Sequence, residues 1–149
     1  MSKKLKKLLL LSLHLTVVLS VASGCQSLSR QNISGVWKGT IQASAADGKD
    51  KWQGPAELTL NQNGDAISGT LVFTHPQAGR VQIPITSGIV SKDAVIFSGQ
   101  NQFPLGGSIE ITVHGVVSGT SLTGTTDMTS RGLFGTVTNS GPLTLFRNK

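Results

Sequence analysis

Few side chains of this sequence could carry covalent or acid–base chemistry. It has 149 residues with a single cysteine, Cys25, and three histidines, of which His75 and His114 lie beyond the first 24 residues. His75 falls in a predicted loop, and His114 follows Glu110 by four positions on the polar face of a predicted strand, at most a surface pair. Serines are too numerous for a Ser–His–Asp triad to mean anything without geometry, and the histidines lack metal-site spacing. The sequence therefore predicts no enzyme, no catalytic residue, no metal site and no cofactor.

Residues 1–24 have the three parts of a secretory signal peptide. A lysine-rich start is followed by an apolar run from Leu8 to Val21 and by small residues directly before Cys25. The run is too short, and wrongly flanked, for a helix that spans a membrane. Four of the 13 Lys and Arg residues leave with this segment, so the mature chain keeps nine basic and seven acidic residues. Because no basic cluster remains, we expect no nucleic-acid binding.

The segment Ala22-Ser23-Gly24-Cys25 resembles the lipobox of bacterial lipoproteins, in which small residues precede a cysteine that is diacylated and becomes the first mature residue. The resemblance implies lipidation of Cys25 with fatty acyl chains such as palmitate, and two or three chains anchor a protein firmly. The alternative is an ordinary signal peptide with a leftover cysteine, which cannot form an internal disulfide. Gln26 follows the cysteine, which by analogy with enterobacterial sorting implies the outer membrane, facing the periplasm.

A tether at 25–33 leads into residues 34–149, which have the pattern of one all-β domain. Short alternating segments of apolar and polar residues are separated by turn residues, and no run has the period of an amphipathic helix. Pro84 cannot donate to a strand ladder and predicts a bulge or a break, while the run Val95-Ile96-Phe97 does not reveal its inward face. The predicted strands are 34–43, 55–62, 66–74, 80–90, 94–101, 108–117, 121–129 and 142–148, with room for a separate extended piece at 136–138.

A repeated two-strand unit indicates how these strands are connected. Turns at Gly64, Lys92 and Gly119 recur at spacings of 28 and 27 residues, and Asn63-Gly64 is a strong hairpin signal. Three hairpins with one strand before and one after give eight strands in an up-and-down meander, rather than a Greek key. Eight antiparallel strands can close into a barrel that holds one small ligand or is filled by side chains.

The connections predict two unlike ends. The tight turns share one end with the start and finish of the domain, whereas longer loops at 44–54, 75–79, 102–107 and 130–141 share the other, as in a cup with a closed base and an open rim. At the middle level, Gly69, Gly115 and Gly124 either leave an internal space or let coiled strands bend. The apolar residues near the rim either form a ligand mouth or cap the core. They are Trp52, Phe73, Phe103, Leu105, Met128 and Phe134.

The motif Gly35-Val36-Trp37 resembles the start of the first strand in calycin barrels, which include lipocalins, avidins and fatty-acid-binding proteins. In lipocalins a basic residue near the end of the last strand packs over this indole, and Arg147 stands at that place here. The resemblance implies a lipocalin-like barrel with a structural base of Gly35, Trp37 and Arg147. The chain departs from the family in having no C-terminal helix and no helical lid after the first strand. With two Trp and no Tyr, biotin binding of the avidin type is not expected.

We therefore expect a lipid-anchored, non-enzymatic lipoprotein of the cell envelope that binds a small apolar or amphipathic ligand at the open end of its barrel. The alternative is a side-chain-filled barrel whose loops at 44–54 and 130–141 dock onto an envelope protein. An integral outer-membrane barrel is not expected, because the outward faces are rich in Ser, Thr and Lys and lack aromatic girdles. The sequence does not identify the ligand or the partner.

Overall fold

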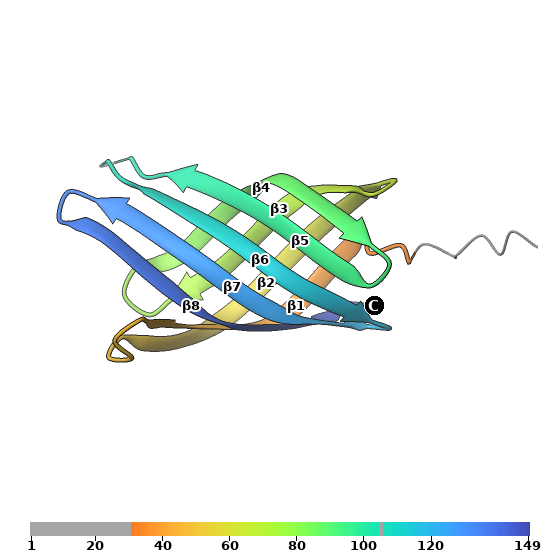
Figure 1. The fold of residues 1–149 in the computed structure, drawn as a ribbon, viewed down its shortest axis with the longest axis horizontal. Coiled ribbons are helices and arrows are strands. Elements are labelled where there is room, and N and C mark those ends of the chain that lie inside the picture. Colours follow the sequence, from red (N-terminus) through yellow and green to blue (C-terminus); the bar gives the residue numbers. More distant parts are fainter. Residues whose placement is uncertain (1–30, 105) are drawn as a thin grey trace, which may run out of the picture.

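The computed structural model describes residues 31–104 and 106–149, which form a closed barrel of eight antiparallel strands (Figure 1). Each strand pairs with its neighbours in sequence, and the first pairs with the last, so the predicted up-and-down barrel is confirmed. None of the described residues forms a helix long and apolar enough to cross a membrane. The strands are β1 Gly35–Ala45, β2 Lys51–Asn63, β3 Ala66–His75, β4 Gly79–Ser91, β5 Ala94–Gln102, β6 Ser108–Ser118, β7 Ser121–Gly132 and β8 Gly135–Arg147.

The inside of the barrel is a packed apolar core to which every strand contributes. Side chains alternate between the two faces of a strand, and the inward positions are occupied by Ile, Leu, Val and aromatic residues. In β5, Val95 and Phe97 are buried whereas Ile96 is 42% exposed, which identifies the inward face that the sequence pattern did not reveal. Figure 1 shows that the chain enters the barrel and reaches its C-terminus at the same end, which we call the base. The opposite end is the rim.

The last strand is longer than predicted. β8 pairs continuously with β7 from Gly135 to Phe146, so the predicted loop at 130–141 is wrong. Residues 136–138 are extended as predicted, but they belong to β8 and are not a separate piece. Only Leu133 and Phe134 connect the two strands. From Gly135 to Thr138 the strand is exposed on both faces, so it lacks the apolar alternation by which a half-buried strand is recognised.

The other rim connections are also shorter than predicted. β2 begins at Lys51, which reduces the predicted loop at 44–54 to residues 46–50. The remaining rim connections are 76–78 and 103–107, and the base turns are 64–65, 92–93 and 119–120. The two ends therefore differ less in loop length than the sequence predicts. The feature that distinguishes the rim is the set of side chains that line its cavity.

The predicted irregularity in β4 is found beside Pro84. The pairing of β4 with β5 shifts register between Ile85 and Ser87, and it ends toward the rim at the pair Ile85 and Gly99. Pro84 has no N–H to continue that ladder. The side-chain amide of Asn101 instead donates to the carbonyl oxygen of Gln82 at 2.7 Å, so a side chain bridges the seam near the rim.

The three glycines at the middle level do not surround an empty space. A Cβ at Gly69 would overlap the backbone carbonyl of Thr59, and one at Gly124 would overlap that of His114. A Cβ at Gly115 would lie 3.3 Å from a Leu122 methyl carbon. Gly69 and Gly124 therefore let neighbouring strands approach closely, which is the bending role that the sequence left open, whereas the space beside Gly115 is occupied by Leu122.

Candidate functional site

The base of the barrel is sealed around Trp37. This side chain is fully buried, and its indole N–H donates to the carbonyl oxygen of Ile33 at 2.9 Å. Arg147, its partner in the β1–β8 register, places its guanidinium carbon 4.8 Å from the centre of the ring. The guanidinium also donates to the backbone carbonyls of Asn32 and Ser34. The indole of Trp37 and the guanidinium of Arg147 together hold the strap of residues 31–34 across this end.

Ile33 completes the seal. The sequence places it in a polar tether, but the structure buries it entirely, and its backbone N–H donates to the side-chain oxygen of Gln62 at 2.9 Å. Ser34 Oγ accepts from the backbone N–H of Gln62 at the same distance. The sequence signal for this burial was a single isoleucine among polar residues, directly before the Gly35-Val36-Trp37 motif. Within the described residues, Ile33 and Trp37 therefore fill this end of the barrel. Cys25, the predicted lipidation site, lies outside the described residues.

At the rim the structure places a cavity of about 200 Å³ inside the barrel mouth. It brings together four of the six residues predicted for the mouth: Trp52, Phe73, Phe103 and Met128. Phe134 is fully exposed at the tip of the β7–β8 hairpin and does not line the cavity, and Leu105 lies outside the described residues. The lining residues that sequence reasoning missed are His75, Ala78, Val81, Ile109, Ser130 and Asn139.

An aromatic cluster forms one wall of this cavity. The rings of Trp52 and Phe73 stack with centroids 5.6 Å apart and an interplanar angle of 19°. The ring of His75 meets the indole edge-on, at 4.7 Å and 69°. His75 is fixed in turn because its Nδ1 accepts hydrogen bonds of 3.1 Å from the backbone N–H groups of Gln77 and Ala78. The wall is therefore held in place by protein contacts alone, as expected of a preformed site.

Two buried polar atoms of the cavity residues have no hydrogen-bond partner within the described part of the chain. They are Nε1 of Trp52, a donor, and Oδ1 of Asn139, an acceptor. A buried polar group without a partner costs about 1–3 kcal/mol, and native proteins contain few of them. Asn139 was missed because the sequence placed it in a loop. The one other such atom among the described residues is Nε of Arg147, at the base.

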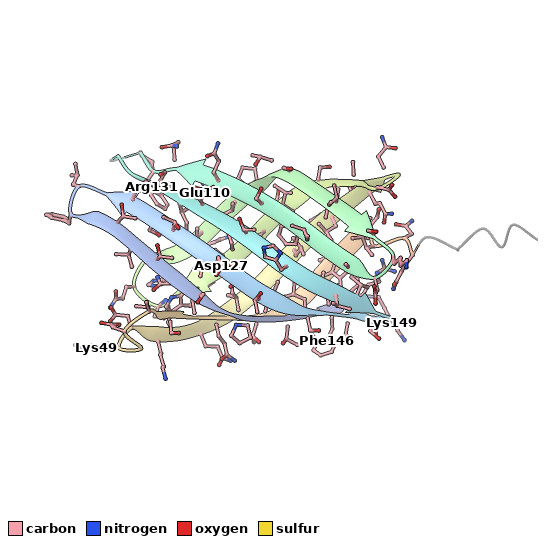
Figure 2. All side chains as sticks on the ribbon, in the orientation of Figure 1. Lys49, Glu110, Asp127, Arg131, Phe146 and Lys149 are labelled. Carbon is pink, nitrogen blue, oxygen red and sulfur yellow. The ribbon has the colours of Figure 1, made fainter. Side chains whose placement is uncertain are left out.

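The outer surface of the described residues carries a hollow of a different kind. A wider groove of about 380 Å³ crosses β1 to β4, but it is open and bordered by the exposed ion pair of Lys38 and Glu57, 3.0 Å apart. Glu110 pairs with Arg131 at 3.4 Å, and both stand on the outside of the barrel in Figure 2. The predicted surface neighbour of Glu110, His114, is exposed. The described residues contain no group of three or more His, Cys, Asp or Glu side chains placed to hold a metal ion.

No model of a known protein family matches this chain, and a search of curated proteins finds no match. The features of this chain that bear on function are therefore those of the barrel itself, above all the difference between its filled base and the cavity at its rim.

Proposed function

We propose that this protein is a lipid-anchored, non-enzymatic lipoprotein of the bacterial cell envelope, whose lipocalin-like barrel binds a small apolar or amphipathic ligand at its open end. The observation that carries the proposal is the cavity at the rim, walled by the stacked Trp52 and Phe73 and by Met128. Concave apolar sites with a few polar groups are the usual form of small-molecule sites. The stacking of Arg147 over Trp37 supports the lipocalin-like assignment.

The size of the cavity limits the ligand. Its volume of about 200 Å³ lies below the roughly 300–1,000 Å³ of sites for drug-sized molecules. It exceeds the roughly 150 Å³ of an engineered apolar cavity that binds benzene. Deeper in the barrel the space is occupied by buried side chains such as Leu58, Ile111 and Leu143. The ligand we propose is therefore a compact molecule of one or two rings, and a long acyl chain would not fit inside.

The anchor proposed at Cys25 fits this orientation. The strap of residues 31–34 enters at the base, where Ile33 and Trp37 are buried, so a lipid attached upstream of it would hold the base toward the membrane. The rim would then face the periplasm from the outer membrane. Two or three acyl chains give the firm anchoring that one chain does not.

Two measurements test the proposal. Mass spectrometry of the N-terminal peptide from the membrane fraction should find Cys25 carrying acyl chains. Cys25→Ser should abolish both the lipid modification and the recovery of the protein in the membrane fraction. An unmodified Cys25 in a soluble protein would refute the anchor. Native mass spectrometry of the lipid-free mature chain carrying Cys25→Ser, kept free of detergent, should detect a bound molecule after exposure to an envelope extract. A barrel that stays empty would count against ligand binding.

The alternative function, an interaction module, is favoured by one observation. Leu133 and Phe134 are 87% and 105% exposed at the tip of the β7–β8 hairpin, on the rim. Two bare apolar side chains on one tip are a form of exposed patch that often marks a protein contact. A photo-crosslinking residue at Phe134 should then trap an envelope protein in intact cells, whereas one at the exposed Ile96 on the barrel wall should not. Equal trapping at both positions would argue against this alternative.

A further inference from the structure

We propose that the outer wall of the barrel at its base is a second contact with the membrane, at which apolar side chains of β4, β5, β6 and β8 rest on the phospholipid surface. This inference rests on the lipid anchor of the proposed function and adds the surface by which the anchored barrel meets the bilayer. Half of the exposed large apolar side chains of the described residues lie at the rim. The other half lie on the outer wall near the base and form what we call the basal arc: Ile89, Ile96, Val116 and Phe146.

The basal arc lies at one level of the barrel. Each of its residues is within two positions of the base end of its strand, a distance of about 7 Å at the rise of a β-strand. Figure 2 shows Phe146 on the outside of the barrel at that end. At the same level across the barrel, β2 and β3 present Asn61 and Ser68, which are exposed and pair with each other. The apolar wall therefore covers one side of the base only.

The register of the strands joins the basal arc into one surface. Ile89 and Ile96 are direct partners across β4 and β5. Val116 stands two positions beyond the β6 partner of Ile96, which makes it a diagonal neighbour at roughly 7–8 Å. On β7, the partners of Val116 and Phe146 are a threonine and a serine, so only short side chains lie between these two. Four side chains that are each 42–56% exposed thus follow one another around five adjacent strands.

The described chain begins in the middle of this arc, on the side from which Cys25 is connected. The side-chain amide of Gln31 donates to the carbonyl oxygen of Gly119 at 3.2 Å, in the turn between β6 and β7. Residues 25–30 connect the predicted lipidation site to Gln31, and six residues span no more than about 20 Å even when fully extended. A lipid on Cys25 would therefore hold the β6–β7 turn, with the basal arc on both sides of it, within that distance of the bilayer.

The charges and the apolar area around the arc both suit a phospholipid surface. Bacterial phospholipids include anionic headgroups, which repel carboxylates and attract lysine. The turn between β4 and β5 carries Lys92 beside Asp93. No Asp or Glu occurs among the described residues between the arc and the base ends of the strands, which are 89–91, 94–96, 116–118, 121–123 and 144–147. Partly exposed apolar side chains gain free energy when they leave water for the bilayer interface, so the arc would favour one orientation of the anchored barrel.

Quenching of a fluorophore by spin-labelled lipid tests this orientation on the lipidated mature chain. The protein would be reconstituted in vesicles of phosphatidylethanolamine and phosphatidylglycerol that contain a nitroxide-labelled phosphatidylcholine. The lipid occupies the sulfur of Cys25, so a fluorophore can be attached to a single introduced thiol. We expect strong quenching at Val116→Cys and little at Ser68→Cys, the matched control at the same level. Adding Ile89→Ser and Ile96→Ser should lower the ratio of docked to undocked protein at least about tenfold, because two partly exposed isoleucines no longer enter the interface.

The outcomes separate this contact from the anchor itself. Equal quenching at Val116→Cys and Ser68→Cys would overturn the basal contact and leave the anchor standing, because a tether alone brings every side of the base equally near the lipid. No quenching at either position would overturn the anchor and this inference together.

A second copy of the chain is the other molecule that could cover the arc. Sedimentation of the lipid-free mature chain carrying Cys25→Ser should show a monomer. A dimer that Ile96→Ser dissociates would assign the basal arc to contact between copies and overturn the membrane contact.

Discussion

The two tryptophans of this protein mark its two ends, and the same chemical group is treated differently at each. At the base, the indole N–H of Trp37 is bonded to Ile33, and a guanidinium covers the ring. At the rim, the indole N–H of Trp52 is buried without a partner beside a hollow. Satisfied polar groups and a filled interior stabilise a fold, whereas unsatisfied ones cost free energy unless a ligand completes them. This difference between the two indoles, in a molecule whose base also holds the unpartnered Nε of Arg147, supports the proposal that the base is structural and that ligands bind at the rim.

The largest effect should come from removing the plug of the base. Trp37→Ala deletes a fully buried indole, and such truncations cost about 3–5 kcal/mol. Chemical denaturation should show this loss in the free energy of unfolding. Any protein that remains folded should keep its ligand preference, because the cavity residues are untouched. A selective loss of binding at full stability would contradict the assignment of Trp37 to the base.

A somewhat smaller loss is expected at the middle level. Gly69→Ala should destabilise the barrel by about 2–3 kcal/mol, because φ there is +149° and the new methyl group would overlap the carbonyl of Thr59. Gly132→Ala is the matched control near the rim, where the added Cβ meets nothing within 4 Å. That variant should lie within about 0.5 kcal/mol of the unaltered protein. Equal effects of the two substitutions would show that the strands do not approach closely at Gly69.

The stacking of Arg147 should contribute less than the plug itself. Arg147→Met keeps much of the apolar stem and removes both the contact with the indole and the hydrogen bonds to the strap. A cation over an indole is worth about 0.5–2 kcal/mol, so we expect a loss of about 1–2 kcal/mol in urea titrations. Arg131→Met, which breaks an exposed ion pair with Glu110, is the control and should cost less than about 1 kcal/mol.

The smallest effect on stability should be found at the rim, with the opposite sign. Asn139→Leu replaces an unpartnered buried oxygen with an apolar group of similar size, which is neutral or stabilising when no ligand is bound. Thermal unfolding of the empty protein should show an unchanged or slightly raised midpoint. Each kcal/mol added to the free energy of unfolding should raise the midpoint by about 4–8 °C. A clear drop would mean that Asn139 already serves the fold.

The base was more predictable from the sequence than the rim, for physical reasons. Tight turns such as Asn63-Gly64 require a positive φ, so their residue types reveal the turns, and the turn count led to strand order, topology and the base. Segments that are exposed on both faces carry no such signal. The rim half of β8 was therefore predicted as a loop, which hid Asn139 and placed Phe134 in a mouth that it does not line. The unpartnered atoms themselves become visible only with side-chain positions.

The central claim is that ligands enter the rim and not the base, and the presence of only two tryptophans makes it directly measurable. A ¹⁵N–¹H correlation spectrum of the mature chain carrying Cys25→Ser should contain two indole N–H signals, assigned by the loss of one in Trp52→Phe. Titration with a compact neutral aromatic compound such as 4-hydroxyacetophenone, small enough for a cavity of about 200 Å³, should shift the signal of Trp52 and leave that of Trp37 in place. A shift confined to Trp37, or no shift of either signal at saturating probe, would contradict the account.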